Sequence, residues 1–183
     1  MLWQYRYALP RGAGGNIQNR GVAVGAGRVF VGTYDDYVVA LDQKTGAEVW
    51  KAATNDSKQC GCSITSAPLF VKDKVIVGVA GGNGAFRGYL TAFDAKTGRL
   101  AWRFFTIPGK GEKGNETWKG DSWKYGGGAT WMTGSFDPGL NLVYWGTGNA
   151  ASDMYSANRF SGEGDGATSI PVSSWLWMPT REN

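Results

Sequence analysis

The sequence predicts an all-β fold, a partial β-propeller of about three blades, each a four-stranded antiparallel sheet. Three observations predict it. The motif Asp-x-Lys-Thr-Gly begins at Asp42 and recurs at Asp94, about fifty residues later. The apolar runs around it are short, rich in β-branched residues and bounded by glycine, which favours strands over helices. The chain also has 29 Gly and 9 Trp in 183 residues, which is typical of turn-rich repeats that bury an indole in each unit.

Two long segments align with each other. Residues 28–32 followed by 38–50 match residues 74–78 followed by 89–102, and both end in Trp after the Asp-x-Lys-Thr-Gly motif. Each segment is expected to form a strand, a loop, a second strand, a tight turn and a third strand. A repeat of this length indicates stacked blades rather than a single closed sheet.

The repeated motif has the residues that a tight hairpin turn requires. Asp42 and Asp94 can accept a hydrogen bond from a backbone N–H two residues further on. Gly46 and Gly98 can take the positive φ that a bulged hairpin needs. The motif is therefore expected at the turn between the last two strands of each blade.

Trp50 and Trp102 follow the turns at equivalent positions. We expect them to pack between blades rather than to contact a substrate. Residues 2–6 resemble the end of an earlier unit, and residues 141–148 are expected to restart the first strand of a third. Two complete repeats would leave bare sheet edges, so the chain is expected to be an open arc over residues 1–150 that needs the remaining blades of a larger propeller.

Charge and composition exclude several classes of function. The 19 basic and 15 acidic residues give a net charge of +4 and are scattered without runs of like charge, so we expect no nucleic-acid partner. The chain has no His, which removes the commonest general base and metal ligand. Catalysis would therefore depend on other side chains or on a cofactor.

Five sequence blocks, in order, resemble the quinoprotein alcohol and methanol dehydrogenases, which use pyrroloquinoline quinone (PQQ). The blocks are Asn-Arg-Gly-Val-Ala at 19–23, Ile-Thr-Ser-Ala-Pro-Leu at 64–69, the run at 87–94, Gly-Gly-Gly-Ala-Thr-Trp at 126–131, and the run from Phe-Asp-Pro at 136–138 to Trp-Gly-Thr-Gly-Asn at 145–149. The resemblance covers residues 2 to about 150. It is more specific than the Asp-x-x-Thr-Gly repeat, which non-catalytic propellers share.

This resemblance implies an eight-bladed periplasmic propeller that oxidises a primary alcohol to an aldehyde and passes electrons to a cytochrome c. The quinone would lie on the propeller axis beside Ca²⁺ or another metal ion. By position, Arg20 would pair with the quinone oxygens, Thr65 would bond a quinone carboxylate, and Trp131 would stack beneath the ring. The remaining expected contacts are backbone N–H groups of Ala80, Gly81 and Gly82, with Asn83 and Asn149 as metal ligands.

The sequence departs from this family at several positions. Gly14 and Gly15 stand where methanol dehydrogenase has a disulfide of adjacent cysteines, and Asn83 stands where it has a metal-binding Glu. The loss of that charge should weaken Ca²⁺ binding. No acidic residue matches the general base of the family, so we assign no catalytic residue and expect the isolated chain to be inactive.

Cys60 and Cys62 flank Gly61 directly before the Thr65 block. With only two cysteines and no His, a four-ligand zinc site is not available. Two interpretations remain open. The pair forms two thiols or one labile bridge on a loop, or it has a redox role at the quinone edge.

Residues 151–183 show no repeat and are expected to form an irregular tail. One back-translation of residues 167–183, read two nucleotides along, spells another Asp-x-Asp-Thr-Gly unit. We therefore hypothesise a frameshift from about residue 166.

The repeat is also compatible with two other functions. A binding or assembly scaffold would use the repeat without a cofactor. A carbohydrate-active propeller would need paired carboxylates in one cleft. The candidates are Asp35 with Asp36 and Glu163 with Asp165, which we interpret as solvated loop charges.

Overall fold

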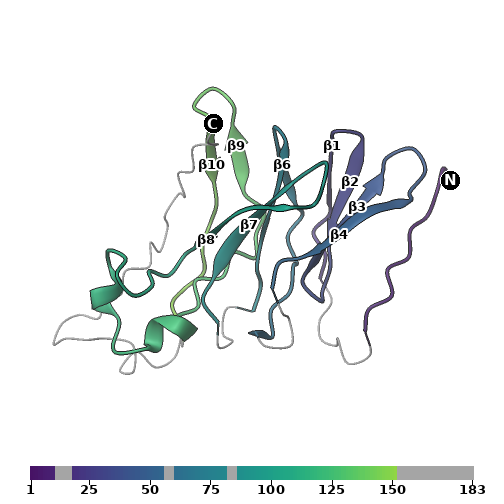
Figure 1. Cartoon of the computed structure of the whole chain (residues 1–183). Coiled ribbons are helices and arrows are strands. Elements are labelled where there is room, and N and C mark those ends of the chain that lie inside the picture. Colours follow the sequence, from purple (N-terminus) through teal and green to yellow (C-terminus); the bar gives the residue numbers. More distant parts are fainter. Residues whose placement is uncertain (11–17, 56–59, 82–85, 152–183) are drawn as a thin grey trace.

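The computed structural model describes residues 1–10, 18–55, 60–81 and 86–151, and two four-stranded sheets and one hairpin lie side by side in it (Figure 1). All strand pairs are antiparallel. The expected all-β partial propeller is confirmed. The irregular tail expected over 151–183, with its hypothetical frameshift, lies outside the described residues apart from residue 151.

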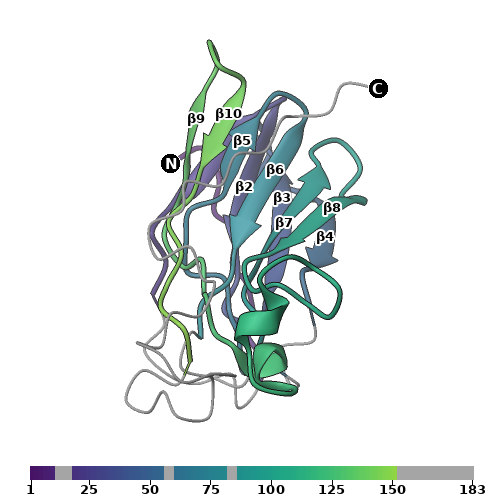
Figure 2. The same ribbon diagram turned by 90° about the vertical axis from the view of Figure 1, so that its left-hand side faces the viewer.

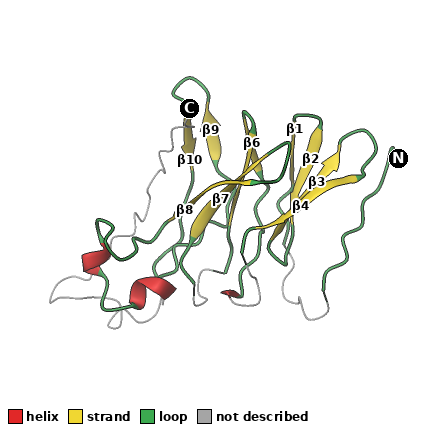
Figure 3. Cartoon of the chain, viewed as in Figure 1, coloured by secondary structure: helices red, strands yellow, loops and turns green. Residues whose placement is uncertain are grey.

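The first sheet has the order β1-β2-β3-β4 and the second the order β5-β6-β7-β8. Hairpin β9-β10 follows, and two 3₁₀ helices lie in the segment before it (Figure 3). The bounds are β1 Val22–Gly25, β2 Arg28–Gly32, β3 Tyr37–Asp42, β4 Glu48–Ala53, β5 Leu69–Val71, β6 Lys74–Gly78, β7 Tyr89–Asp94, β8 Leu100–Phe105, η1 Asn115–Thr117, η2 Ser122–Tyr125, β9 Ser135–Asp137 and β10 Leu142–Tyr144.

The sheets contain a strand that the aligned sequence segments did not include. Each segment was expected to open with 28–32 or 74–78, but these are second strands, β2 and β6, which pair with the preceding β1 and β5. For the same reason residues 142–144 form β10, the partner of β9, and not the first strand of a third unit. The expectation was wrong because β1, β5 and β9 are only three or four residues long, too short to give a clear alternation.

The repeated motif forms the expected turn in both sheets. Asp42 Oδ1 accepts hydrogen bonds from the backbone N–H of Lys44 and Thr45 at 3.0 and 2.9 Å. Asp94 Oδ1 accepts one from the N–H of Thr97 at 2.8 Å. Gly46 and Gly98 have φ of 74° and 73°, so the turn takes the left-handed backbone that glycine allows without strain.

Neighbouring sheets pack face to face, and β1 contacts β5. Figure 2 shows β5, β9 and β10 toward one side of the arc and β4 and β8 toward the other. Residues of the first two sheets bury each other in one core, and residues of the second sheet and the β9-β10 hairpin do so in another. The first core includes Phe30, Val38, Val75 and Phe93, and the second includes Ile76, Leu90, Val143 and Trp145.

The interblade role expected for Trp50 is confirmed. Its indole Nε1 donates to the carbonyl oxygen of Ala95 at 3.1 Å, and its ring lies against Gly98. Trp3 repeats this arrangement one sheet earlier, because its Nε1 donates to Gln43 O at 3.0 Å and its ring lies against Gly46. Each indole thus packs on the turn of the following sheet. Trp102 is partly buried against the second core.

Candidate functional site

Three of the predicted site residues meet where the chain enters the first strand of successive sheets. Arg20 precedes β1, Thr65 precedes β5 and Trp131 precedes β9. The backbone N–H of Arg20 donates to Thr65 O at 3.1 Å, and its guanidinium Nη1 donates to the same oxygen at 3.2 Å. The Thr65 hydroxyl donates a long hydrogen bond, of 3.4 Å, to the backbone oxygen of Trp131. Segments far apart in the sequence are therefore joined where they lead into the first strands of three successive sheets.

The exposure of these three side chains differs. Arg20 is exposed, whereas Thr65 is buried. Trp131 is 37% exposed, an unusual state for an indole, and one edge of its ring lies against Gly148. A side chain at Gly148 would meet Trp131 Cζ3 at 2.5 Å, so this glycine gives the indole its place. Trp131 thus offers a partly accessible indole, and the exposed Arg20 is linked to its backbone through Thr65.

The structure restricts one of the predicted backbone donors. The N–H of Ala80 donates to Ser63 O at 2.8 Å, and the N–H of Ser63 donates back to Ala80 O at 3.2 Å. The Ala80 N–H therefore already has a partner, so its role is to anchor the Thr65 segment. Gly81 is exposed with φ of 118°, and Gly82 lies outside the described residues.

Of the two predicted metal ligands, only Asn149 is described. It is exposed, and its Nδ2 donates to Ala150 O at 3.1 Å while its backbone oxygen accepts the N–H of Gly128 at 2.9 Å. The loop of Asn149 is thereby fixed to the glycine run before Trp131. Asn83 falls outside the part of the chain that the structure describes, as do Gly14 and Gly15.

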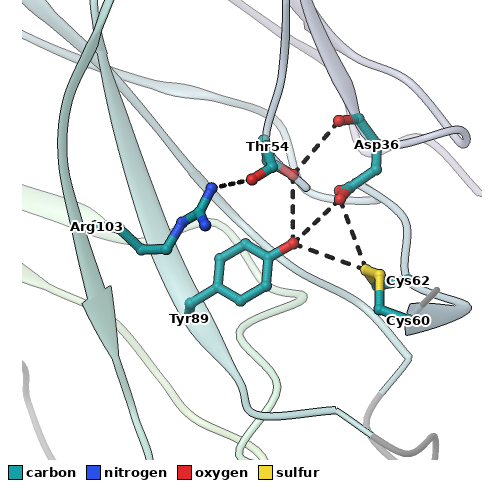
Figure 4. The surroundings of a disulfide bond; sticks show 6 residues. All are labelled: Asp36, Thr54, Cys60, Cys62, Tyr89 and Arg103. Atoms are coloured by element: carbon teal, nitrogen blue, oxygen red, sulfur yellow. Dashed lines mark hydrogen bonds between the residues drawn. A yellow bond between two sulfur atoms is a disulfide. The ribbon is translucent and has the colours of Figure 1, made fainter. Parts of the chain in front are cut away.

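A second cluster of polar groups was missed from the sequence. The interpretation of Asp35 and Asp36 as solvated charges is wrong, because their residues are only 6% and 0% exposed. Asp35 accepts hydrogen bonds from Thr33 Oγ1 at 2.6 Å and Tyr7 O–H at 2.9 Å. Asp36 lies between the first two sheets, where the Tyr89 hydroxyl donates to its Oδ2 at 3.1 Å (Figure 4).

The environment of this cluster changes how its groups titrate. Burial raises the pKa of Asp36, although hydrogen bonds from Thr54 and Tyr89 and the charge of Arg103 oppose that rise. Burial also raises the pKa of the Tyr89 hydroxyl. Asp36 lies in the β2–β3 loop with φ of 71°, and no sequence signal marks this loop carboxylate as buried.

The two cysteines form a disulfide, Cys60–Cys62, at the edge of this cluster. The structure thus has one bridge rather than two thiols, and the redox role at the quinone edge stays a prediction. Ser63 and Thr65 follow the bridge directly in the chain, so the disulfide and the Arg20–Thr65–Trp131 group share one segment.

Comparison with known proteins agrees with these features. A family model described as the β-propeller domain of glucose, ethanol and alcohol dehydrogenases, labelled PQQ, matches residues 2–171. The chain belongs to this family. Among the described residues no helix is long and apolar enough to cross a membrane.

Individual relatives in this family are alcohol dehydrogenases by name. Quinohemoprotein alcohol dehydrogenase ADH IIB of Pseudomonas putida is 46% identical over 73% of this chain and 21% of its own length. Quinoprotein alcohol dehydrogenase PedH, also of Pseudomonas putida, is 36% identical over 95% of this chain and 35% of its own. The solved structure of a europium-containing methanol dehydrogenase superposes with a TM-score of 0.80 at 37% identity, covering 86% of this chain and 31% of that one. The chain thus spans about a fifth to a third of the length of these relatives.

Proposed function

We propose that this chain is a segment of a PQQ-dependent alcohol dehydrogenase and supplies one wall of its quinone site. The observation that carries the proposal is the group formed by Arg20, Thr65 and Trp131, which three separate segments bring together. The similarity to quinoprotein alcohol and methanol dehydrogenases supports the same activity. The reaction proposed is oxidation of a primary alcohol to an aldehyde.

The residues present fit a flat, tricarboxylated quinone. The partly exposed indole of Trp131 offers an aromatic ring that would stack against a conjugated ring. The guanidinium Nη1 of Arg20 donates to Thr65 O at 3.2 Å, so it is fixed to the segment that also bonds the Trp131 backbone, and its charge would neutralise a carboxylate or quinone oxygen. When bound, the quinone would supply the two-electron acceptor for the alcohol, while these residues orient it and exclude water from its lower face.

Thr65 would hold its hydroxyl where it can donate a hydrogen bond to a ligand carboxylate. Its hydroxyl reaches Trp131 O only at 3.4 Å, a weak hydrogen bond that a ligand carboxylate can replace. The backbone bonds between Ser63 and Ala80 and between Thr65 and Arg20 would meanwhile keep the segment in place. The hydroxyl would thus gain a stronger, charge-assisted partner on binding.

We also propose the location, partners and metal ion of the complete protein, on the ground of its family. The complete protein would be periplasmic, with the other propeller blades, a small alcohol substrate and cytochrome c as electron acceptor. Asn149, with Asn83, would offer carbonyl oxygens to Ca²⁺ or another hard cation such as a lanthanide. The carboxylates needed for tight binding of that ion and for general-base catalysis would come from other parts of the complete protein.

Calorimetric titration of PQQ into the full chain, with Ca²⁺ present, tests the proposal. We expect saturable binding that weakens about tenfold in Trp131→Ala and tenfold or more in Arg20→Ala. Matched controls are Trp102→Ala and Arg99→Ala, which change an indole and an exposed guanidinium away from the site and should leave the affinity unchanged.

Two results would oppose the proposal. Absence of saturable heat would favour the scaffold function, in which the repeat has no cofactor. Equal loss of affinity in the site variants and in their controls would place the quinone elsewhere. In a complete propeller carrying this chain, dye-linked oxidation of a primary alcohol should fall in the same order as the affinities.

A further inference from the structure

The Cys60–Cys62 disulfide encloses a single residue and lies at the boundary between solvent and core. Cys62 is 3% exposed and packs with Val79, Phe86 and Tyr89, whereas Cys60 is only partly buried. Gly61 between them is exposed and has φ of 60°. An external thiol can therefore approach Cys60 but not Cys62.

The bridge contributes little as a structural staple. A disulfide stabilises a fold largely by removing conformations from the unfolded chain, and this effect grows with the length of the loop it closes. The loop here contains only Gly61. The position of this bridge therefore calls for an explanation other than stability.

A buried carboxyl group faces the inner sulfur atom. Asp36 Oδ2 lies 3.6 Å from Cys62 Sγ and accepts the hydrogen bond of Tyr89 O–H at 3.1 Å (Figure 4). Asp36 is fully buried, and its Oδ1 has no hydrogen-bond partner among the residues that the structure describes. An unpaired carboxylate is costly in such a place, whereas a protonated carboxyl is tolerated.

We infer that Cys60–Cys62 is a thiol–disulfide exchange site for small thiols and dithiols, with Asp36 as the proton donor to Cys62. An external thiolate attacks Cys60 Sγ, a new S–S bond forms to that sulfur, and the Cys60–Cys62 bond breaks. The electron pair passes to Cys62 Sγ, which takes the proton of the Asp36 carboxyl. A second external thiolate then releases Cys60 as a thiolate and leaves as the oxidised disulfide, so two electrons enter the protein.

The groups around Asp36 set the pH range of this step. Burial raises its pKa, which keeps the carboxyl protonated to higher pH than usual. The negative charge of Asp35 acts in the same direction, while hydrogen bonds from Thr54 and Tyr89 and the positive charge of Arg103 act against it. Arg103 lies 4.9 Å from the centre of the Tyr89 ring.

This exchange would be coupled to the neighbouring segment. Cys62 is followed by Ser63, whose backbone pairs with Ala80, and by Thr65, whose backbone oxygen holds Arg20. Reduction would lengthen the allowed distance between the two sulfur atoms at the start of this segment. The inference does not rest on the proposed quinone function, because the exchange chemistry needs only residues of this chain and an external thiol.

The experiment is reduction of the native full chain by dithiothreitol, quenched with N-ethylmaleimide and read by mass spectrometry. We expect both cysteines to become alkylated without denaturant and to be protected again after oxidised dithiothreitol is added. The rate constant per external thiolate should fall as pH rises, because Asp36 loses its proton. In Asp36→Asn it should be lower by about tenfold or more at low pH and should no longer depend on pH.

Two further variants keep the test decisive if Asp36→Asn does not fold. Tyr89→Phe removes a hydrogen bond that favours the ionised carboxylate, so it should move the pH profile upward. Asp35→Asn removes a neighbouring negative charge, so it should move the profile downward and leave its low-pH plateau unchanged. Circular dichroism would verify that each variant is folded.

Three outcomes would overturn the inference. The bond resists dithiothreitol until urea unfolds the chain, the rates of wild type and Asp36→Asn coincide, or neither neighbouring variant moves the pH profile. Calorimetry with PQQ is a separate readout, so failure of the exchange chemistry and failure of the quinone proposal are distinguishable.

Discussion

The first and second sheets have the same strand register but different surroundings. In both sheets the second and third strands pair in the same register, which starts at Arg28 with Asp42 in the first sheet and at Lys74 with Asp94 in the second. In both, a bulge interrupts the pairing of the third and fourth strands, after Ala40 or Ala92. The segments that leave the sheets differ. One carries the Cys60–Cys62 bridge, and the other carries two 3₁₀ helices before Trp131. The repeat thus builds equivalent ladders, while chemistry is placed in segments that do not repeat.

The largest expected effect concerns the contacts between sheets. Trp50→Ala should lower the free energy of unfolding by about 4 kcal/mol, because it removes a large apolar side chain and its hydrogen bond to Ala95 O. The substitution also removes the contacts of the indole with Phe30 and Phe93, whose ring centres lie 5.8 and 6.3 Å from that of Trp50. Urea denaturation followed by circular dichroism measures the change.

The equivalent substitution in the second sheet should have a smaller effect. Trp102→Ala should cost about 2 kcal/mol. Both indoles are partly buried against a core, but of the two only Trp50 has, among the described residues, a hydrogen bond to the next sheet, to Ala95 O. Equal losses in the two variants would contradict the idea that the Trp50 position joins complete sheets. Trp50→Phe, which keeps apolar area but not the N–H donor, should fall between wild type and Trp50→Ala.

Substitution of the equivalent glycines Gly32 and Gly78 should also destabilise the two sheets to different extents, because their surroundings differ. A Cβ atom on Gly78 would lie 1.9 Å from the backbone oxygen of Thr130, whereas on Gly32 it would meet the side chain of Ile64 at 2.2 Å. Backbone cannot move aside as a side chain can. We expect Gly78→Ala to destabilise by about 3 kcal/mol and Gly32→Ala by about 1–2 kcal/mol. Thermal unfolding of both variants in parallel gives the order, and a reversed order would contradict this explanation.

The sequence predicted the parts of the molecule that repeat. The turns at Asp42 and Asp94 and the place of Trp50 follow from local rules, because turn residues and period determine them with little help from distant contacts. The short strand β1 was missed since four residues carry too little pattern, and its pairing with β2 depends on the tertiary fold.

The candidate site was less predictable. Arg20, Thr65 and Trp131 were found by resemblance, and only the structure places them in contact. The burial of Asp36 was not accessible from the sequence at all, because a carboxylate in a loop is solvated by default and this one is covered by a neighbouring sheet. Which loop side chain a neighbouring sheet covers depends on the tertiary fold, and the repeat period does not reveal it.

The smallest expected effect contrasts a turn carboxylate with the buried one. Hydrogen bonds from Thr97 lower the pKa of Asp94, and burial raises the pKa of Asp36, both from 3.8. A lowered pKa in the folded state gives stability that is present above pH 3.8 and is lost as pH falls through the folded value. A raised pKa gives stability that is present below pH 3.8 and is lost as pH rises through the folded value.

The difference in the free energy of unfolding between wild type and each Asn variant, plotted against pH, should therefore have opposite slopes for Asp94 and Asp36. For Asp94→Asn, the stability advantage of the wild type should shrink as the pH is lowered below 3.8, and only slightly, because Asp94 lies near the surface and solvent screens its charge. For Asp36→Asn, that advantage should shrink as the pH is raised above 3.8, since the wild type must then bury a charge or take up a proton. Urea unfolding at a series of pH values yields both curves. Slopes of the same sign would mean that Asp36 reaches solvent as Asp94 does. The contrast between a solvated turn carboxylate and a carboxyl buried between sheets would then be wrong.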